Sequence, residues 1–156
     1  MRTETDTQTA VTGSDAAAIA YQPESCPPPP SLRTLIAGAS DVYKALEDIR
    51  GTDREHLMVF DLNVRHRVLQ RRTVHIGTLT GLECHPREVF KPAIISSAAA
   101  IVLAHNHPSN DASPSRADID LTHRLREAGD LLGIPLLDHV IVCADGYVSL
   151  AERNWR

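Results

Sequence analysis

Aromatic side chains, long apolar runs and an excess of basic residues are all scarce or missing in this sequence of 156 residues. Aromatic residues amount to 4%, so we expect an aliphatic core and no stacking platform for single-stranded nucleic acid. The alanine-rich run at residues 16–20 is too short for a secretory leader or a membrane span. We therefore expect neither a targeting segment nor contact with a membrane.

The cysteines are also few. Cys26, Cys84 and Cys143 are odd in number and widely spaced, and no Cys-x-x-Cys pair occurs. Such a pattern does not provide the disulfide framework of a small secreted domain. We therefore expect a reducing, cytoplasmic location.

The charge balance is mildly acidic, with a formal net charge of -4 and a pI near 6.0. Nonspecific binding to nucleic acid needs a concentrated basic surface, so this role is disfavoured. The one stretch with clustered basic residues contains Arg65, Arg67, Arg71 and Arg72. We predict that this stretch forms the solvated face and turn of a hairpin.

Residues 1–30 are predicted to form a disordered tail. They alternate threonines with charges and end in Cys26 and four prolines at 27–30, a stiff extended run that cannot join a helix or sheet. The tail is interpreted as a linker, with a docking site for a proline-binding module as the alternative. The chain is 42% hydrophobic, which is enough for a core, and we place that core in one domain at residues 31–156.

Apolar patterning in this domain predicts alternating helices and strands. Helices are expected at 41–49, 87–99 and 115–132, and strands at 55–62, 68–76, 100–104, 135–143 and 147–150. Ser40 and Asp41 are expected to cap the first helix and Gly51 to close it, and Pro92 is expected to lie in the first turns of the second helix or to kink it. The early strands are closely spaced, which indicates antiparallel pairing. The predicted fold class is therefore α/β, a single domain with a mixed central β-sheet flanked by helices.

Two histidines end the third predicted strand. His105 and His107 are two residues apart, so in an extended chain both imidazoles point the same way, and Pro108 stops the strand beyond them. Imidazole is a good zinc ligand, and a catalytic zinc site needs three protein ligands and an open position. The alternative is a pair of ordinary hydrogen-bonded loop histidines.

A third ligand is available from the following helix. Asp118 heads the helical stripe that should pack on the sheet, where an unpaired carboxylate would be costly. A metal shared with His105 and His107 would compensate the buried charge. The alternative is a simple capping box formed by Ser115 and Asp118. The hydroxyl of Ser115 is expected either to cap the helix or to donate to an oxyanion beside the metal.

Hydrolysis at such a site needs a base. Glu55 opens the first predicted strand, where its carboxylate could orient a water molecule on the zinc and carry its proton to a leaving amine. Glu83 and Glu88 are competing candidates for the base. The alternative for Glu55 is an ordinary solvent-exposed residue at the start of a strand.

These residues resemble a known family. His-x-His, then ten residues and Asp, with Ser three before the Asp, is similar to the JAMM motif of the MPN (JAB) metallohydrolases. The segments HNHPSNDASPSRAD, GTLTGLECHPREVFKPAI and LLGIPLLDHVIV resemble the RadC-like branch, and the resemblance covers roughly residues 32–153. It implies an MPN/JAB-like fold with the layering of cytidine deaminases. It also implies Zn²⁺ on His105, His107 and Asp118, Glu55 as base, and Ser115 as the residue that steadies the transition state.

Two departures from that branch matter. The family usually has glycine where this chain has Asn110, and asparagine is the next best residue for a left-handed conformation, so we expect the loop to survive. Full-length members also carry an N-terminal helix-hairpin-helix region, in place of which this sequence has only the predicted tail. This second departure weakens a DNA-repair function.

Several other polar residues lie outside this motif. Asp138 and His139 are adjacent in a predicted strand and should face opposite sides, either as a satisfied buried pair or as support for a zinc histidine. Cys84 and His85 are not expected to bind metal, and His123 is expected to be solvated.

The leading hypothesis is a zinc-dependent hydrolase that cleaves a peptide or isopeptide amide bond. The rival is a DNA-repair-associated accessory protein whose metal site is structural or vestigial. A third option is a module that binds a tagged peptide without cutting it. The sequence does not identify the peptide or protein substrate.

Overall fold

A computed structural model describes residues 34–77 and 84–155, and in this part of the chain three helices and one five-stranded sheet are formed. The elements follow one another as α1 (Ala39–Ala45), β1 (His56–Leu62), β2 (Val68–Ile76), α2 (Pro86–Ile95), β3 (Ala100–Asn106), α3 (Arg116–Leu132), β4 (Leu136–Val142) and β5 (Tyr147–Ser149). The predicted tail at residues 1–30 lies outside the described residues.

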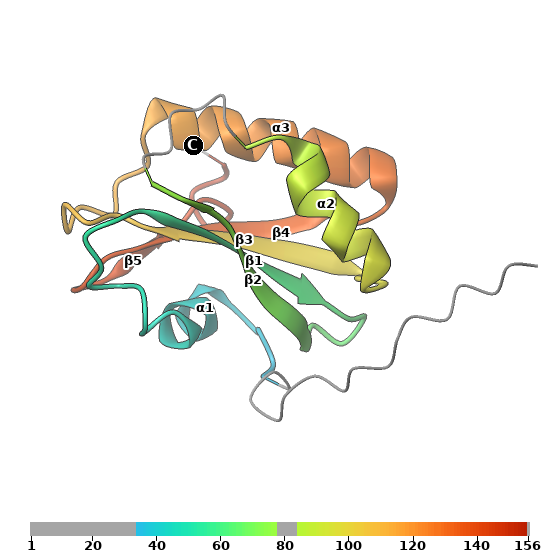
Figure 1. Ribbon diagram of the computed structural model, residues 1–156, viewed down its shortest axis with the longest axis horizontal. Coiled ribbons are helices and arrows are strands. Elements are labelled where there is room, and N and C mark those ends of the chain that lie inside the picture. Colours follow the sequence, from blue (N-terminus) through green and yellow to red (C-terminus); the bar gives the residue numbers. More distant parts are fainter. Residues whose placement is uncertain (1–33, 78–83, 156) are drawn as a thin grey trace, which may run out of the picture.

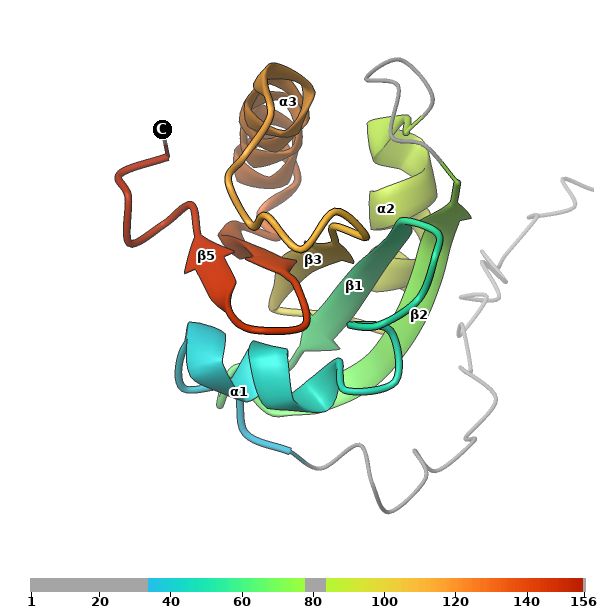
Figure 2. The same cartoon turned by 90° about the vertical axis from the view of Figure 1, so that its left-hand side faces the viewer.

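The sheet is mixed, as predicted. Its strand order is β2-β1-β3-β4-β5, and only β3 and β4 pair in parallel, joined through α3. Helix α1 covers one face of the sheet, and α2 and α3 cover the other (Figures 1 and 2). The fold is thus the predicted α/β layering.

Each face of the sheet buries its own aliphatic cluster. Val102 and Ala104 of β3 belong to the cluster on the α1 face, whereas Ile101 and Leu103 belong to the cluster beneath α2 and α3. This alternation follows from the two-residue period of a strand. It also places His105, the next residue in the odd-numbered row, on the α3 face.

Three predicted helix boundaries are wrong, namely both ends of the first helix and the end of the second. Helix α1 begins at Ala39 with Gly38 as its N-cap and ends at Ala45, so Ser40 and Asp41 lie inside the helix and residues 46–51 form turns. Asp41 still accepts a hydrogen bond from the backbone N–H of Ala37, at 2.9 Å. The Asp41 side chain therefore holds the segment that precedes the helix but does not cap the helix.

Helix α2 ends at Ile95, four residues before its predicted end, and contains Pro92 within its length. Beyond it, Ser97 takes a left-handed φ of 54°, while the Ser97 and Ala98 N–H groups donate to the carbonyls of Ile94 and Ala93. These two bonds form a Schellman motif. Serine replaces the usual glycine, which is why the end of this helix was missed.

Candidate metal centre

The first candidate ligand sits at the carboxyl end of β3. The predicted strand stops at residue 104, but β3 continues through His105 and Asn106, both paired with β4. The His105 side chain is fully buried against α3. The sheet and the helix thus fix its ring from two sides.

His107 follows the end of the strand and is partly buried. Its Nδ1 lies 2.7 Å from the carbonyl oxygen of Asp111, an atom that can only accept, so Nδ1 carries a hydrogen, and in the neutral ring Nε2 keeps its lone pair. The intervening loop bends at Asn110, whose φ of 61° confirms the predicted left-handed conformation. The Asn110 amide also donates to Asp145 at 2.6 Å, which anchors the loop to the turn after β4.

The third candidate ligand, Asp118, lies in the first turn of α3 and is 2% exposed. Ser115 is the N-cap, and the capping box is complete: the Ser115 hydroxyl accepts from the Asp118 N–H, and Asp118 Oδ2 accepts from the Ser115 N–H at 2.8 Å. The same oxygen lies 2.6 Å from the Ser115 hydroxyl. The Asp118 carboxylate completes the capping box and also faces the two histidines. Capping and metal binding, which the sequence left as alternatives, are therefore compatible.

The three side chains converge on one point. His105 Nε2 lies 2.9 Å from His107 Nε2 and 3.2 Å from Asp118 Oδ1, and His107 Nε2 lies 3.6 Å from Asp118 Oδ2. Ligand atoms about 2.0–2.1 Å from a tetrahedral zinc ion would be about 3.3 Å apart, a value inside this range. The donor set and its spacing therefore fit a zinc-sized cation. In the described residues this is the one group of three or more such side chains with that property.

The electrostatics of this cluster favour a cation. Burial lowers the pKa of His105 to about 4, so its ring is neutral near pH 7. Burial alone would raise the pKa of Asp118, but hydrogen bonding and the neighbouring histidines outweigh it and hold that pKa well below its usual range. The neighbouring Asp118 carboxylate is the main reason that the pKa of His107 is raised, because it stabilises a proton on the His107 ring. A fixed carboxylate thus faces two imidazole nitrogens in a largely buried site.

Glu55 immediately precedes β1 and is partly buried. Its charge contributes to the raised pKa of His107, which places the carboxylate on the cluster's side of the molecule. It lines a pocket of about 400 Å³ whose other walls are Asp53, Arg54, Gly77, Pro108 and Ser109. This pocket joins the predicted base to the loop that directly follows His107.

The competing glutamates are not placed in this way. Glu88 is exposed in the first turn of α2 and contacts Arg87, and Glu83 lies outside the described residues.

Asn106, between the two histidines, is a site residue that sequence reasoning missed. It is fully buried and points away from the cluster; its Oδ1 accepts from the His56 N–H at 2.7 Å and its amide donates to the Arg54 carbonyl at 2.9 Å. These bonds hold the backbone on both sides of Glu55. Strand alternation could have signalled it, because a polar residue between two inward-facing histidines must be satisfied on the opposite face.

Asp138 and His139 point apart, as predicted. Asp138 accepts from the Ser149 hydroxyl and the Ala151 N–H, so it stabilises the turn after β5. His139 instead faces the cluster, and its Nε2 lies 2.8 Å from Nδ1 of His105. Asp138 is therefore a satisfied polar residue away from the cluster. His139, in contrast, contacts a candidate zinc histidine, which fits the alternative that it supports such a ligand.

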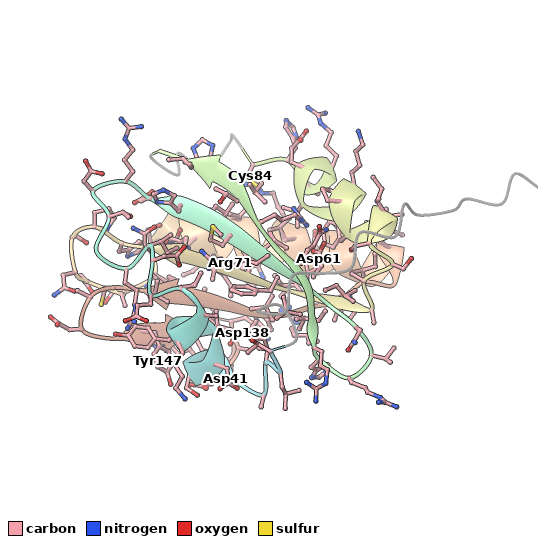
Figure 3. All side chains as sticks on the ribbon, turned by 60° about the horizontal axis from the view of Figure 1, so that its bottom comes forward. Asp41, Asp61, Arg71, Cys84, Asp138 and Tyr147 are labelled. Atoms are coloured by element: carbon pink, nitrogen blue, oxygen red, sulfur yellow. The ribbon has the colours of Figure 1, made fainter. Side chains whose placement is uncertain are left out.

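The prediction of a solvated arginine face is wrong for Arg71 and Arg72, which are both partly buried. Arg71 donates to the Ala45 carbonyl and pairs with Asp48 at 2.5 Å, on the α1 side. In Figure 3, Arg71 and Asp61 both lie within the outline of the domain.

Arg72 faces the opposite side, where it pairs with the buried Asp61 at 3.0 Å and donates to the carbonyls of Glu88 and Val89. Pro92 has no N–H to offer the Glu88 carbonyl, so Arg72 supplies a donor that the helix lacks. The arginines at 71 and 72 are thus structural and do not form a basic surface.

The solvated position predicted for His123 is confirmed. His123 is exposed, and His85 is the N-cap of α2 beside the buried free thiol of Cys84. Across residues 34–77 and 84–155, no helix has the length and apolar character needed to cross a membrane.

Comparison with known proteins matches most of the chain to one protein family. The RadC-like JAB domain matches residues 36–155. Among the relatives are UPF0758 proteins of Desulforamulus reducens, 48% identical over 81% of this chain and 56% of the relative, and of Rubrobacter xylanophilus, 50% identical over 78% and 54%. The chain spans about half the length of the curated relatives it matches. It belongs to the family of RadC-like JAB domains.

Proposed function

We propose that this protein is a zinc-dependent hydrolase of peptide or isopeptide amide bonds. The observation that carries the proposal is the convergence of His105 Nε2, His107 Nε2 and an Asp118 oxygen at zinc-like spacing, next to a pocket lined by Glu55. Three protein ligands leave a tetrahedral ion one position for solvent or substrate, as catalytic zinc sites require.

A zinc ion held there would supply a Lewis acid that polarises the scissile carbonyl and makes a water molecule more acidic. The protein's own groups would manage the protons. Glu55, at the wall of the pocket, would take a proton from the attacking water and pass it to the leaving amine.

Ser115 is proposed to donate a hydrogen bond to the developing oxyanion. Its hydroxyl now lies 2.6 Å from Asp118 Oδ2, so it would exchange that bond for one to the substrate. Its exposed position at the start of α3, one turn from the candidate ligand Asp118, supports this role.

Metal content and hydrolysis test the proposal together. Protein purified without chelator should hold about one zinc ion per chain, measured by atomic emission, and should release new primary amines from a peptide library. His107→Ala should lose both properties. Wild-type protein without near-stoichiometric zinc, or a His107→Ala variant that retains it, would contradict the proposal.

The base is tested separately by Glu55→Gln. This variant should keep its zinc but lose amine release by about 100-fold or more, the usual scale for a general base. Glu88→Gln is the matched control, because it neutralises an exposed carboxylate that does not line the pocket. If Glu55→Gln leaves the protein's function unchanged, a module that binds tagged peptides without cutting them is favoured instead.

The rival, a DNA-repair-associated accessory protein, is motivated by the repair label of the family and by the arginines at residues 65–72. Arg71 and Arg72 are engaged with Asp48 and Asp61, so the support from the arginines is reduced. Salt-dependent DNA binding lost in Arg71→Ala and Arg72→Ala variants that remain folded, with no hydrolysis of any peptide, would favour the rival.

A further inference from the structure

A chain of hydrogen bonds runs from α3 to the back of His105. Thr122 Oγ1 donates to the backbone carbonyl of Asp118 at 2.6 Å and also lies 2.6 Å from His139 Nδ1. On its other side, His139 Nε2 lies 2.8 Å from His105 Nδ1. The side chains of Thr122, His139 and His105 are all essentially excluded from solvent.

When His105 and His139 are both neutral, only one placement of hydrogens satisfies all of these contacts. A carbonyl oxygen can only accept, so the single hydroxyl hydrogen of Thr122 goes to Asp118. The Thr122 oxygen then accepts, and the hydrogen between it and His139 must sit on Nδ1. A neutral His139 therefore has a bare Nε2, which can only accept from His105 Nδ1.

The consequence falls on the other nitrogen of His105. With Nδ1 protonated, a neutral His105 presents the lone pair of Nε2 to His107 and Asp118. A neutral His107 presents its Nε2 lone pair to the same point, because its Nδ1–H donates to the Asp111 carbonyl. Two nitrogen lone pairs 2.9 Å apart repel each other unless a cation, either a proton or a metal ion, lies between them.

We propose that Thr122 and His139 are positioning residues that hold His105 in the Nδ1-protonated tautomer, with Nε2 directed at the metal. This inference deepens the proposed function and rests on its metal site. Thr122 also bonds the backbone of Asp118, so a single hydroxyl ties the first ligand to the third. Burial strengthens the effect, because no solvent is available to replace a lost partner.

Thr122→Val removes the hydroxyl at nearly constant volume and Thr122→Ser restores it. Ser149→Ala is the matched control, because it removes another buried hydroxyl whose bonds go to Asp138, away from the cluster. Zinc affinity, measured by competition with a fluorescent chelator, should fall about tenfold or more in Thr122→Val, the scale found for groups that orient metal ligands. Thr122→Ser and Ser149→Ala should bind zinc as the wild type does.

The tautomers are read directly by nitrogen NMR of zinc-free protein with labelled histidines. In the wild type, His105 and His139 should both show a protonated Nδ1 and a bare Nε2. In Thr122→Val, His139 loses its acceptor, and a share of His105 should shift to the Nε2-protonated form. Packing changes alone would not produce this shift.

Three results would overturn the inference. A wild-type His139 or His105 protonated on Nε2 would show that the hydrogens run the other way. Unchanged affinity and tautomer in Thr122→Val would show that the hydroxyl is not needed, and an affinity loss without a tautomer shift would assign the effect to packing. A wild type that binds no zinc would refute the proposed function, while the tautomer comparison would still decide this inference.

Discussion

His105 and Asn106 are neighbours at the end of β3, yet they serve opposite faces of the sheet. His105 faces α3, where it joins a buried cluster in which each candidate ligand has fixed partners. Asn106 faces the other way and holds the backbone around Glu55, at the wall of an open pocket. Under the proposed function, metal affinity depends on one face of the sheet and the position of the base on the other, so mutations should separate them.

The largest expected effect concerns the metal face. If zinc is held there, chelation should lower the free energy of unfolding by about 2.7 kcal/mol for protein kept in zinc at 100 times its Kd. Chemical denaturation with and without chelator measures this. The His107→Ala variant should show no effect of the chelator. Equal stability of the wild type with and without chelator would contradict zinc binding at this cluster.

The face of the base is probed by Asn106→Ala. This change leaves the buried His56 N–H without an acceptor, so we expect a loss of about 2 kcal/mol in unfolding free energy. Zinc affinity should stay near the wild-type value while hydrolysis falls, because only the Glu55 backbone is released. Asn63→Ala is the control, since its carbonyl bonds two exposed backbone N–H groups in a turn away from the site.

A pH series sharpens the difference between the two histidines. The pKa of His107 is raised, mainly by its bond to Asp118, so in metal-free protein a proton competes with zinc as pH falls through and below that value. His105, whose pKa is lowered to about 4, should not compete above that pH. Apparent zinc affinity should therefore fall by at most tenfold per pH unit, or about 1.4 kcal/mol, since one proton is displaced. A steeper fall near pH 6 would show that a second group titrates.

The smallest effect is expected at Asn110, in the loop between the second and third ligands. Asn110→Ala should cost about 1–2 kcal/mol, because alanine tolerates a left-handed φ poorly and cannot bond Asp145. Asn110→Gly should cost less, since glycine removes the backbone strain and loses only the side-chain bond. Thermal unfolding of both variants measures the difference, and an Asn110→Gly variant less stable than Asn110→Ala would contradict it.

Strong local signals made much of this fold predictable. The strand at Val68–Ile76 was predicted with its observed bounds, and α3 was predicted to within one residue because Ser115 and Gly133 are standard cap residues. The end of α2 was missed because Ser97 takes a glycine-like conformation. Local sequence does not encode such an exception.

The metal cluster was predictable because motif spacing and strand alternation bring His105 and His107 together with Asp118. Its surroundings were not. The bond between His105 and His139 joins residues 34 apart on parallel strands, and that between Asn106 and His56 spans 50 residues. Both depend on sheet register, which a single sequence leaves open.

The proposal that three side chains hold one cation with a position left open can be tested by anomalous scattering at the zinc edge from crystals of the protein. We predict one peak about 2.0–2.2 Å from His105 Nε2, His107 Nε2 and an Asp118 oxygen, with no fourth protein ligand. Absence of a peak from this cluster in zinc-soaked crystals, or a fourth side chain closing the coordination, would contradict the account.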